Sequence, residues 1–213
     1  MQFEAPEELD HGQVFEDAWK DSSSTSIELP PVDVNQVLSN RYSTSEPVTF
    51  TRNMMWDLEV RKAWRPDRYI PSVVRDGTAM TWAGRSTETG NDQFTRASKQ
   101  RTWLDPEEVD LVLERCHVDM QEQMVTFIGV DDVRGPQGRQ LESGSKQPLF
   151  HVIHSVDGQE DRPLNRWRIV HLTEKPDPDL VDRFERMAED PWLPEYVEIY
   201  LRKDLNVELI RQE

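Results

Sequence analysis

The stretch PLFHVIHSVDGQEDRPLNRWRIVHL, residues 148–172, predicts a hairpin of two strands joined by a polar turn. Three of the chain's five histidines, His151, His154 and His171, lie in it. If the strands pair symmetrically about the turn, His151 faces His171 and His154 points to the other side of the sheet. Two neutral imidazoles on one face can share a proton. We therefore take His151 and His171 as candidate acid–base residues.

Further candidate strands precede this hairpin, and short polar segments connect them. Connections of this length are typical of an antiparallel meander, because a parallel crossover needs a dozen or more residues. Residues 106–120 also contain good helix formers, but their alternation slightly favours a strand. The four candidates span residues 78–86, 93–104, 109–120 and 123–133.

The region before these strands supports two interpretations. Alternating apolar residues over 48–60 favour a strand through about Trp56. The alternative is a short strand followed by a helix over 54–64. Pro66 and Pro71 then limit the chain to one helical turn near 67–70.

The C-terminal part of the chain is predicted to be helical. Leu180, Phe184 and Met187 follow the i, i+4, i+7 spacing of one helix face. Pro191 and Pro194 interrupt this helix. A second helical segment is predicted over 195–210.

Charge and length suggest an acidic arm followed by one domain. The net charge is −16, which argues against binding to nucleic-acid phosphates or to anionic membranes. Residues 1–33 carry nine acidic side chains and one lysine, with a candidate short helix at 7–20. We expect residues 1–44 to form an acidic N-terminal arm that is partly disordered or peripheral, and residues 45–213 to form a single α+β domain.

Residue usage also limits the compartment. The single cysteine, Cys116, excludes an intrachain disulfide. No run of 18 apolar residues occurs, and the first residues are acidic where a signal peptide would be basic and then apolar. We expect a cytoplasmic protein without a transmembrane helix.

The order of these elements resembles the START/polyketide-cyclase-like (SRPBCC, helix-grip) superfamily over about residues 45–205. The residues behind it are PVTFTRNMMWDLEV and RPDRYIPSVV, then the run of strands, then DPDLVDRFERMAEDPWLPEYVEIYL. The resemblance implies a curved antiparallel sheet of about six to seven strands wrapped around a long C-terminal helix, with an apolar cavity between them. Lipocalin-like calyx proteins share much of this order.

Under this resemblance, aromatic residues would line the cavity. The candidate wall residues are Trp56, Tyr69, Trp82, Trp103 and Trp167. Arg101, which lies in a candidate strand, is the candidate anchor for an anionic group. Such a pocket would bind a hydrophobic small molecule and, as a cyclase or dehydratase without a cofactor, would use His151 and His171 as acid and base.

Two alternatives remain open. His117 and Asp119 share one strand face, and with His171 they match the 2-His-1-carboxylate set of non-haem Fe(II) oxygenases and cupin-like metal enzymes. In that family a basic residue follows the distal histidine, and Arg183 is the candidate here. The other alternative is a non-enzymatic or chaperone-like module whose acidic arm or C-terminal helix binds a protein partner.

Overall fold

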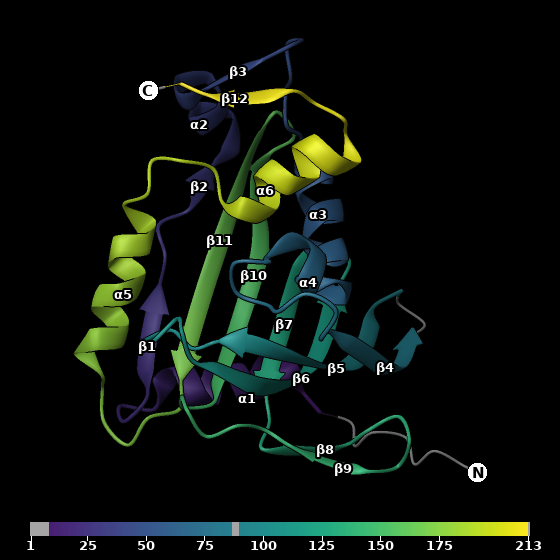
Figure 1. The fold of residues 1–213 in the computed structure, drawn as a ribbon, viewed down its shortest axis with the longest axis vertical. Helices are drawn as coiled ribbons and strands as arrows, with labels where there is room; N and C mark the ends of the chain where they lie inside the picture. The colour runs from purple at the N-terminus through teal and green to yellow at the C-terminus, as the bar shows by residue number, and fades with distance from the viewer. Residues whose placement is uncertain (1–8, 87–89, 213) are drawn as a thin grey trace.

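A curved antiparallel sheet of eight strands dominates the computed structural model, which describes residues 9–86 and 90–212 (Figure 1). The strands follow the order β1-β11-β10-β7-β6-β5-β4, and β2 also pairs with β11. The predicted α+β class with an antiparallel sheet is confirmed. The strands are β1 (Thr25–Glu28), β2 (Val32–Asp33), β4 (Met80–Ser86), β5 (Asp92–Arg101), β6 (Val109–Asp119), β7 (Met124–Gly129), β10 (Phe150–Gln159) and β11 (Arg162–His171).

The predicted meander is confirmed from β4 to β11. Each of the six candidate strands forms a strand, including β6, for which a helix was the alternative. Each pairs antiparallel with its neighbour. Between β7 and β10 the chain adds a small separate hairpin, β8 (Asp132–Arg134) and β9 (Gln140–Glu142).

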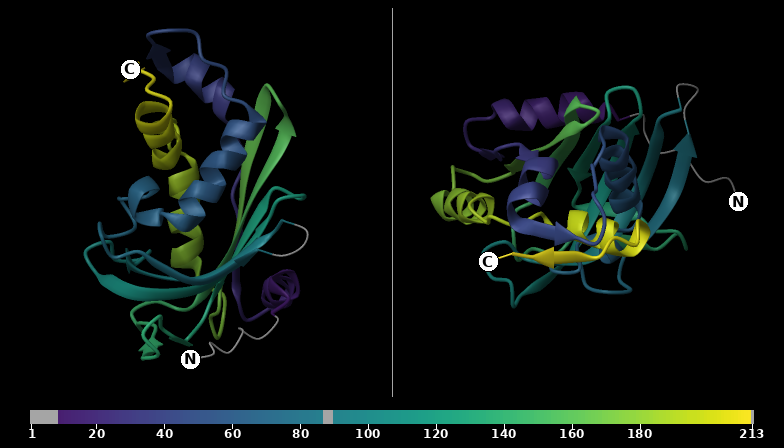
Figure 2. Two further views of the ribbon diagram at one scale, coloured as in Figure 1. Left: turned by 90° about the vertical axis from the view of Figure 1, so that its right-hand side faces the viewer. Right: turned by 90° about the horizontal axis from the view of Figure 1, so that it is seen from above.

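Helices lie on both faces of the sheet. Figure 2 shows α1 (His11–Lys20) against the convex face. The concave face holds α3 (Arg52–Trp64), α4 (Pro66–Tyr69) and α6 (Glu195–Ile199), which continues into the π-helical segment η1 (Tyr200–Asp204). At one end of the molecule lie α2 (Val34–Arg41) and the small sheet of β3 (Tyr42–Thr44) and β12 (Leu209–Arg211).

The strand predicted through about Trp56 is wrong, and the alternative helix over 54–64 is confirmed, because Arg52–Trp64 form α3. The Thr51 side chain caps the helix by accepting a hydrogen bond from the Met54 backbone N–H at 3.1 Å. The buried face includes Met55, Leu58, Glu59 and Lys62, at the i, i+3, i+4, i+7 spacing of a helix. Two of these four are charged, so the apolar pattern alone does not reveal the helix.

The expectation of a peripheral N-terminal arm is wrong for residues 9–44; residues 1–8, including the start of the predicted helix at 7–20, lie outside the described residues. Phe15 of α1 is fully buried against Ile128, Ile153 and Val170 of the sheet. β1 pairs with β11, with Ile27 opposite Ile169. Most acidic residues of this segment are exposed, while apolar residues such as Phe15 and Ile27 join the core.

The C-terminal helical region forms two separate helices, as the prolines predict. Between them lie Pro191 and Pro194, and α5 (Pro178–Ala188) runs beside β1 at the edge of the sheet (Figure 1). The helix held against the concave face is α6 with η1. Within the described part of the chain, no helix is long and apolar enough to cross a membrane.

The register of the opening hairpin differs by one residue from the symmetric pairing. Gln159 pairs with Arg162, which leaves Glu160 and Asp161 as a two-residue turn. The symmetric pairing would centre on Asp161 and needs a three-residue loop. In the observed register His151 lies opposite Val170, and His171 lies opposite Phe150. Directly opposed residues share a face, and neighbouring residues alternate between faces. The shift of one residue therefore places His151 and His171 on opposite faces of the sheet.

We predict that Phe15→Ala lowers the free energy of unfolding by about 3 kcal/mol or more, because it empties a fully buried site in the convex-face core. Urea unfolding followed by circular dichroism measures the change. Lys20→Ala, at an exposed position of the same helix, is the control and changes stability by less than about 0.5 kcal/mol. Equal values for the two variants would mean that α1 is peripheral after all.

Candidate functional site

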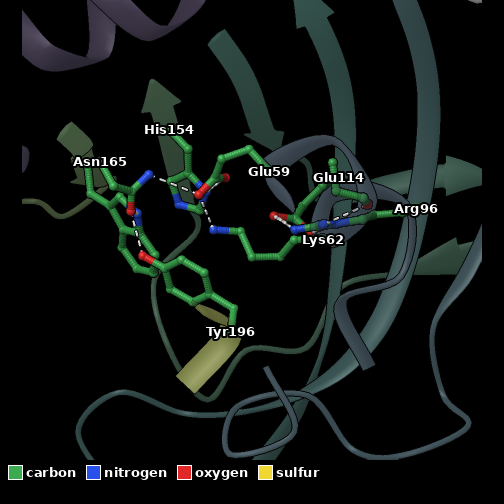
Figure 3. Close-up of polar contacts among 9 residues, drawn as sticks. Glu59, Lys62, Arg96, Glu114, His154, Asn165 and Tyr196 are labelled. Carbon is green, nitrogen blue, oxygen red and sulfur yellow. Dashed lines mark hydrogen bonds and ion pairs between the residues drawn. The ribbon is translucent and has the colours of Figure 1, made fainter. Parts of the chain in front are cut away.

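A buried polar network joins α3 to the concave face of the sheet (Figure 3). At its centre Glu59 has no exposed surface. Its Oε1 accepts hydrogen bonds from Lys62 Nζ at 2.7 Å and from Asn165 Nδ2 at 3.0 Å. Its Oε2 lies 3.1 Å from His154 Nδ1. Each carboxylate oxygen therefore has partners, as a buried charge requires.

Aromatic rings surround the cation of this network. Lys62 Nζ lies 3.8 Å from the centroid of the Tyr196 ring and 4.9 Å from that of Trp167. The Trp167 ring stacks on His154 at a centroid distance of 4.2 Å and on Tyr196 at 5.7 Å. The ammonium thus has one carboxylate and two ring faces in place of water.

Asn165 connects the network to α6. Its Oδ1 accepts hydrogen bonds from Tyr196 Oη at 2.5 Å and from Trp167 Nε1 at 3.0 Å. Its amide group donates to Glu59. One amide side chain therefore links residues from α3, α6 and β11, and every polar group in this chain of contacts has a partner.

Protonation in the network follows from burial and charge. Burial alone would raise the pKa of Glu59, but the nearby Lys62 ammonium and His154 hold it well below its ordinary value. Burial, and then the Lys62 charge, lower the pKa of His154 to about 4. Glu59 is therefore ionised and His154 neutral at pH 7. A carboxylate only accepts hydrogen bonds, so His154 carries its proton on Nδ1 and its Nε2 is unprotonated.

A second buried ion pair lies on the same face. Arg96 Nε and Nη2 bind the two carboxylate oxygens of Glu114 at 2.5 and 3.1 Å. A third nitrogen, Nη1, donates to the Ala63 carbonyl of α3 at 2.9 Å. The guanidinium also covers the Phe127 ring at 4.2 Å. This bidentate pair fixes the C-terminal half of α3 on the sheet.

Next to the network lies a cavity of about 510 Å³. Its walls come from the sheet, from the loops near residues 29–32 and 70–73, and from the chain between Met187 and Arg202. The walls are mainly apolar and aromatic, and the volume is typical of a small-molecule site. Its aromatic lining residues are Trp103, Trp167, Trp192 and Tyr196.

Three residues belong to both the cavity wall and the polar network: Asn165, Trp167 and Tyr196. Because their polar atoms bond to one another, these three wall side chains are held in a fixed arrangement. Glu59, Lys62 and His154 lie behind this wall and do not line the cavity. The network therefore shapes the wall from behind.

The predicted catalytic residues do not come together. His151 and His171 point to opposite faces of the sheet, so the predicted pair is wrong. His151 lies on the convex side, where its Nδ1 accepts a hydrogen bond from the Gly129 N–H at 3.2 Å. His171 is fully buried beside the rings of Phe150 and Phe184. Arg101 is exposed and donates to the Pro106 carbonyl at 3.1 Å.

The predicted wall residues divide into two groups. Trp103 and Trp167 line the cavity. The other three do not. Trp56 is buried in α3, and Tyr69 donates to Asp204 at 3.0 Å. Trp82 packs in a cluster with Ala97, Leu113 and Val133, separate from the main core.

The geometry also rules against the predicted iron ligands. Sheet register places His117 and Asp119 on the convex face, where the His117 ring centroid lies 5.3 Å from that of His11. His171 lies on the concave face beside Phe184 of α5. The three side chains therefore cannot bind one metal ion. Arg183, the candidate basic residue, is exposed on α5.

Sequence reasoning missed the centre of the network. The sequence analysis does not single out Glu59 or Lys62, and it places His154 on the face opposite the predicted pair. One usable signal was the placement of both charges at helical spacing from Met55 and Leu58, on what becomes the buried face of α3. The face of the sheet on which His154 lies depends on the register of the hairpin, and the length of the turn sets that register.

No protein-family model matches the chain, and no curated protein matches it in sequence. Solved structures with a similar fold include the Zhui aromatase/cyclase from Streptomyces sp. R1128, with a TM-score of 0.47 and 11% identity over 84% of this chain and 95% of that one. Ara h 8.0201 matches with a TM-score of 0.47 and 9% identity, over 83% and 98%. A major latex-like protein of Panax ginseng matches with 0.40 and 11%, over 78% and 98%. The likeness to these structures concerns the fold alone.

We predict that Lys62→Met lowers the free energy of unfolding by about 3–5 kcal/mol, because it leaves the Glu59 carboxylate buried without its cation. Urea unfolding at pH 7 measures the loss. The matched control is Arg61→Met on the same helix, whose ion pair with Asp57 is half exposed and contributes at most about 1 kcal/mol. Similar losses in both variants would show that the buried network does not stabilise the fold.

We also predict a pH dependence centred on His171. Burial lowers the pKa of His171 to about 4, against the opposing effect of Asp177, whereas the unfolded chain has the ordinary value of about 6.5. The unfolded state therefore binds more protons as pH falls through 6.5, and stability decreases toward pH 4. His171→Leu should remove about 2 kcal/mol of the loss between pH 7 and pH 5. Urea unfolding at the two pH values measures it, and an unchanged pH dependence would contradict the assignment.

Proposed function

We propose that this protein binds an apolar, aromatic-sized small molecule in the cavity beside α6. The observation that carries the proposal is the cavity of about 510 Å³ whose wall contains the rings of Trp103, Trp167 and Tyr196. Aromatic side chains in a mainly apolar wall suit an apolar ligand, because they offer a large apolar area for burial. A mainly apolar lining with polar groups at some positions is typical of small-molecule binding sites.

Binding is preferred to a cyclase or dehydratase reaction for a specific reason. The residues predicted as acid and base, His151 and His171, are not among those that line the cavity, and neither is His154. The buried Tyr196 hydroxyl donates to Asn165, and burial raises the pKa of Tyr196 well above its ordinary value. Proton transfer to a ligand would require this bond to break.

A neutral fluorescent probe, N-phenyl-1-naphthylamine, tests the proposal. We expect saturable fluorescence enhancement with one site per chain. Ala188→Trp, at an exposed position that lines the cavity, places a large ring in it and should weaken binding about tenfold or more. Fluorescence titration measures the affinity.

Arg186→Trp is the matched control for this experiment. It adds the same ring to α5, about 200° around the helix from Ala188, at an exposed position that does not line the cavity. Its affinity for the probe should stay within about twofold of the parent protein. Absence of saturable binding in the parent, or equal effects of both variants, would refute the proposal.

A further inference from the structure

We propose that the ligand of this cavity is an amphipathic anion, an apolar molecule with an acidic head group that Arg202 and Arg211 bind. The inference rests on the proposed function and adds the chemical class of the ligand. Both arginines line the cavity, and they come from different elements, η1 and the end of β12. They meet at one carboxylate, that of Glu198 in α6.

The contacts of Glu198 define the cluster. Its Oε2 accepts from Arg202 Nη1 at 2.7 Å, and its Oε1 accepts from Arg211 Nε at 2.8 Å. Tyr42 Oη donates to Oε1 as well, at 2.5 Å. Burial would raise the pKa of Glu198, but the Tyr42 bond and the two arginines hold it below its ordinary value. The cluster therefore contains two positive charges and one negative charge.

The arginines keep unused hydrogen-bonding capacity. A guanidinium has five N–H donors. The Glu198 carboxylate and the Leu209 carbonyl, which accepts from Arg202 Nη2 at 3.0 Å, cannot accept from all ten donors of the pair. Their side chains are 40% and 49% exposed, whereas the Glu198 side chain is 7% exposed. By contrast, the Arg96 side chain is 8% exposed and binds both carboxylate oxygens of Glu114. Arg202 and Arg211 can therefore accept a second anion without leaving Glu198.

Two other acidic residues line the cavity, and both have their own partners. Glu195 Oε2 accepts from the Ser72 hydroxyl at 2.5 Å, and Asp190 Oδ1 accepts from the Trp192 N–H at 3.0 Å. Within residues 9–86 and 90–212, no ion pair joins either acid to Arg202 or Arg211. Glu195 precedes Arg202 by about two helical turns, or roughly 10 Å. Glu195 therefore lies along the cavity wall from the arginine pair and does not neutralise it.

This arrangement gives a ligand two attachments. Its apolar body lies against the aromatic wall residues Trp103, Trp167 and Tyr196, and its acidic group lies at Arg202 and Arg211, beside the Trp192 ring that Arg211 covers at 4.9 Å. Guanidinium groups bind carboxylate and similar oxyanions through paired N–H donors. Glu198 competes with the ligand for these donors.

A pair of probes with the same aromatic framework separates the two attachments. N-phenyl-1-naphthylamine is neutral, and 8-anilinonaphthalene-1-sulfonate adds one sulfonate. We expect the sulfonate probe to bind at least as tightly as the neutral one, although the net charge of −16 repels anions. Arg202→Gln and Arg211→Gln should each weaken the sulfonate probe about five- to tenfold and change the neutral probe less than about twofold.

Glu198→Gln tests the same site with the opposite sign. The amide oxygen still accepts hydrogen bonds, but removing the competing charge should tighten binding of the sulfonate probe several-fold and leave the neutral probe unchanged. If the three residues only hold the C-terminal strand in place, all three variants would weaken both probes. The control is Arg68→Gln, which removes an exposed arginine paired with Asp204 outside the cavity and should alter neither probe.

The results distinguish this inference from the proposed function. If the neutral probe shows no saturable binding, both the proposed function and the inference are refuted. If the neutral probe binds and the affinity for the sulfonate probe is the same in all three variants as in the parent protein, only the anion site is refuted. Affinity for the neutral probe also reports whether each variant still forms the cavity, so a folding defect cannot imitate the expected result.

Discussion

The Glu59 carboxylate has no exposed surface, and the rest of the structure must supply the partners that water would otherwise provide. Lys62 comes from the same helix, but His154 and Asn165 come from two strands of the sheet. Helix α3 can therefore sit on the sheet in one position and one rotation only. An apolar helix face tolerates small shifts, whereas a buried charge loses several kcal/mol when one partner moves away.

This constraint extends from α3 to the cavity through three shared side chains. The Asn165 amide group donates a hydrogen bond to Glu59, and its Oδ1 accepts hydrogen bonds from Trp167 and Tyr196. The two rings also cover the Lys62 ammonium. The wall of the cavity is consequently held by the same contacts that neutralise the buried charges. A preorganised wall reduces the conformational entropy that a ligand would have to overcome on binding.

Near the C-terminal end of α6 a different network lines the cavity. Glu198 connects Tyr42 of β3, Arg202 of η1 and Arg211 of β12, so residues distant in the sequence meet at one carboxylate. The two networks differ in exposure. Lys62 is enclosed and serves the fold, whereas Arg202 and Arg211 are half exposed and can still contact a ligand.

The amino-acid sequence by itself determined the strands between residues 78 and 171, their antiparallel order and the division of the C-terminal helices at Pro191 and Pro194, because these follow from local alternation, short turns and missing N–H groups. Only the tertiary structure decided that α3 is a helix with a charged buried face, that His154 belongs to the site in place of His151, and that residues 9–44 are part of the core. The physical reason is that a two-residue turn sets the hairpin register, and that the cost of burying Glu59 and Lys62 is offset only by side chains that are distant in the sequence.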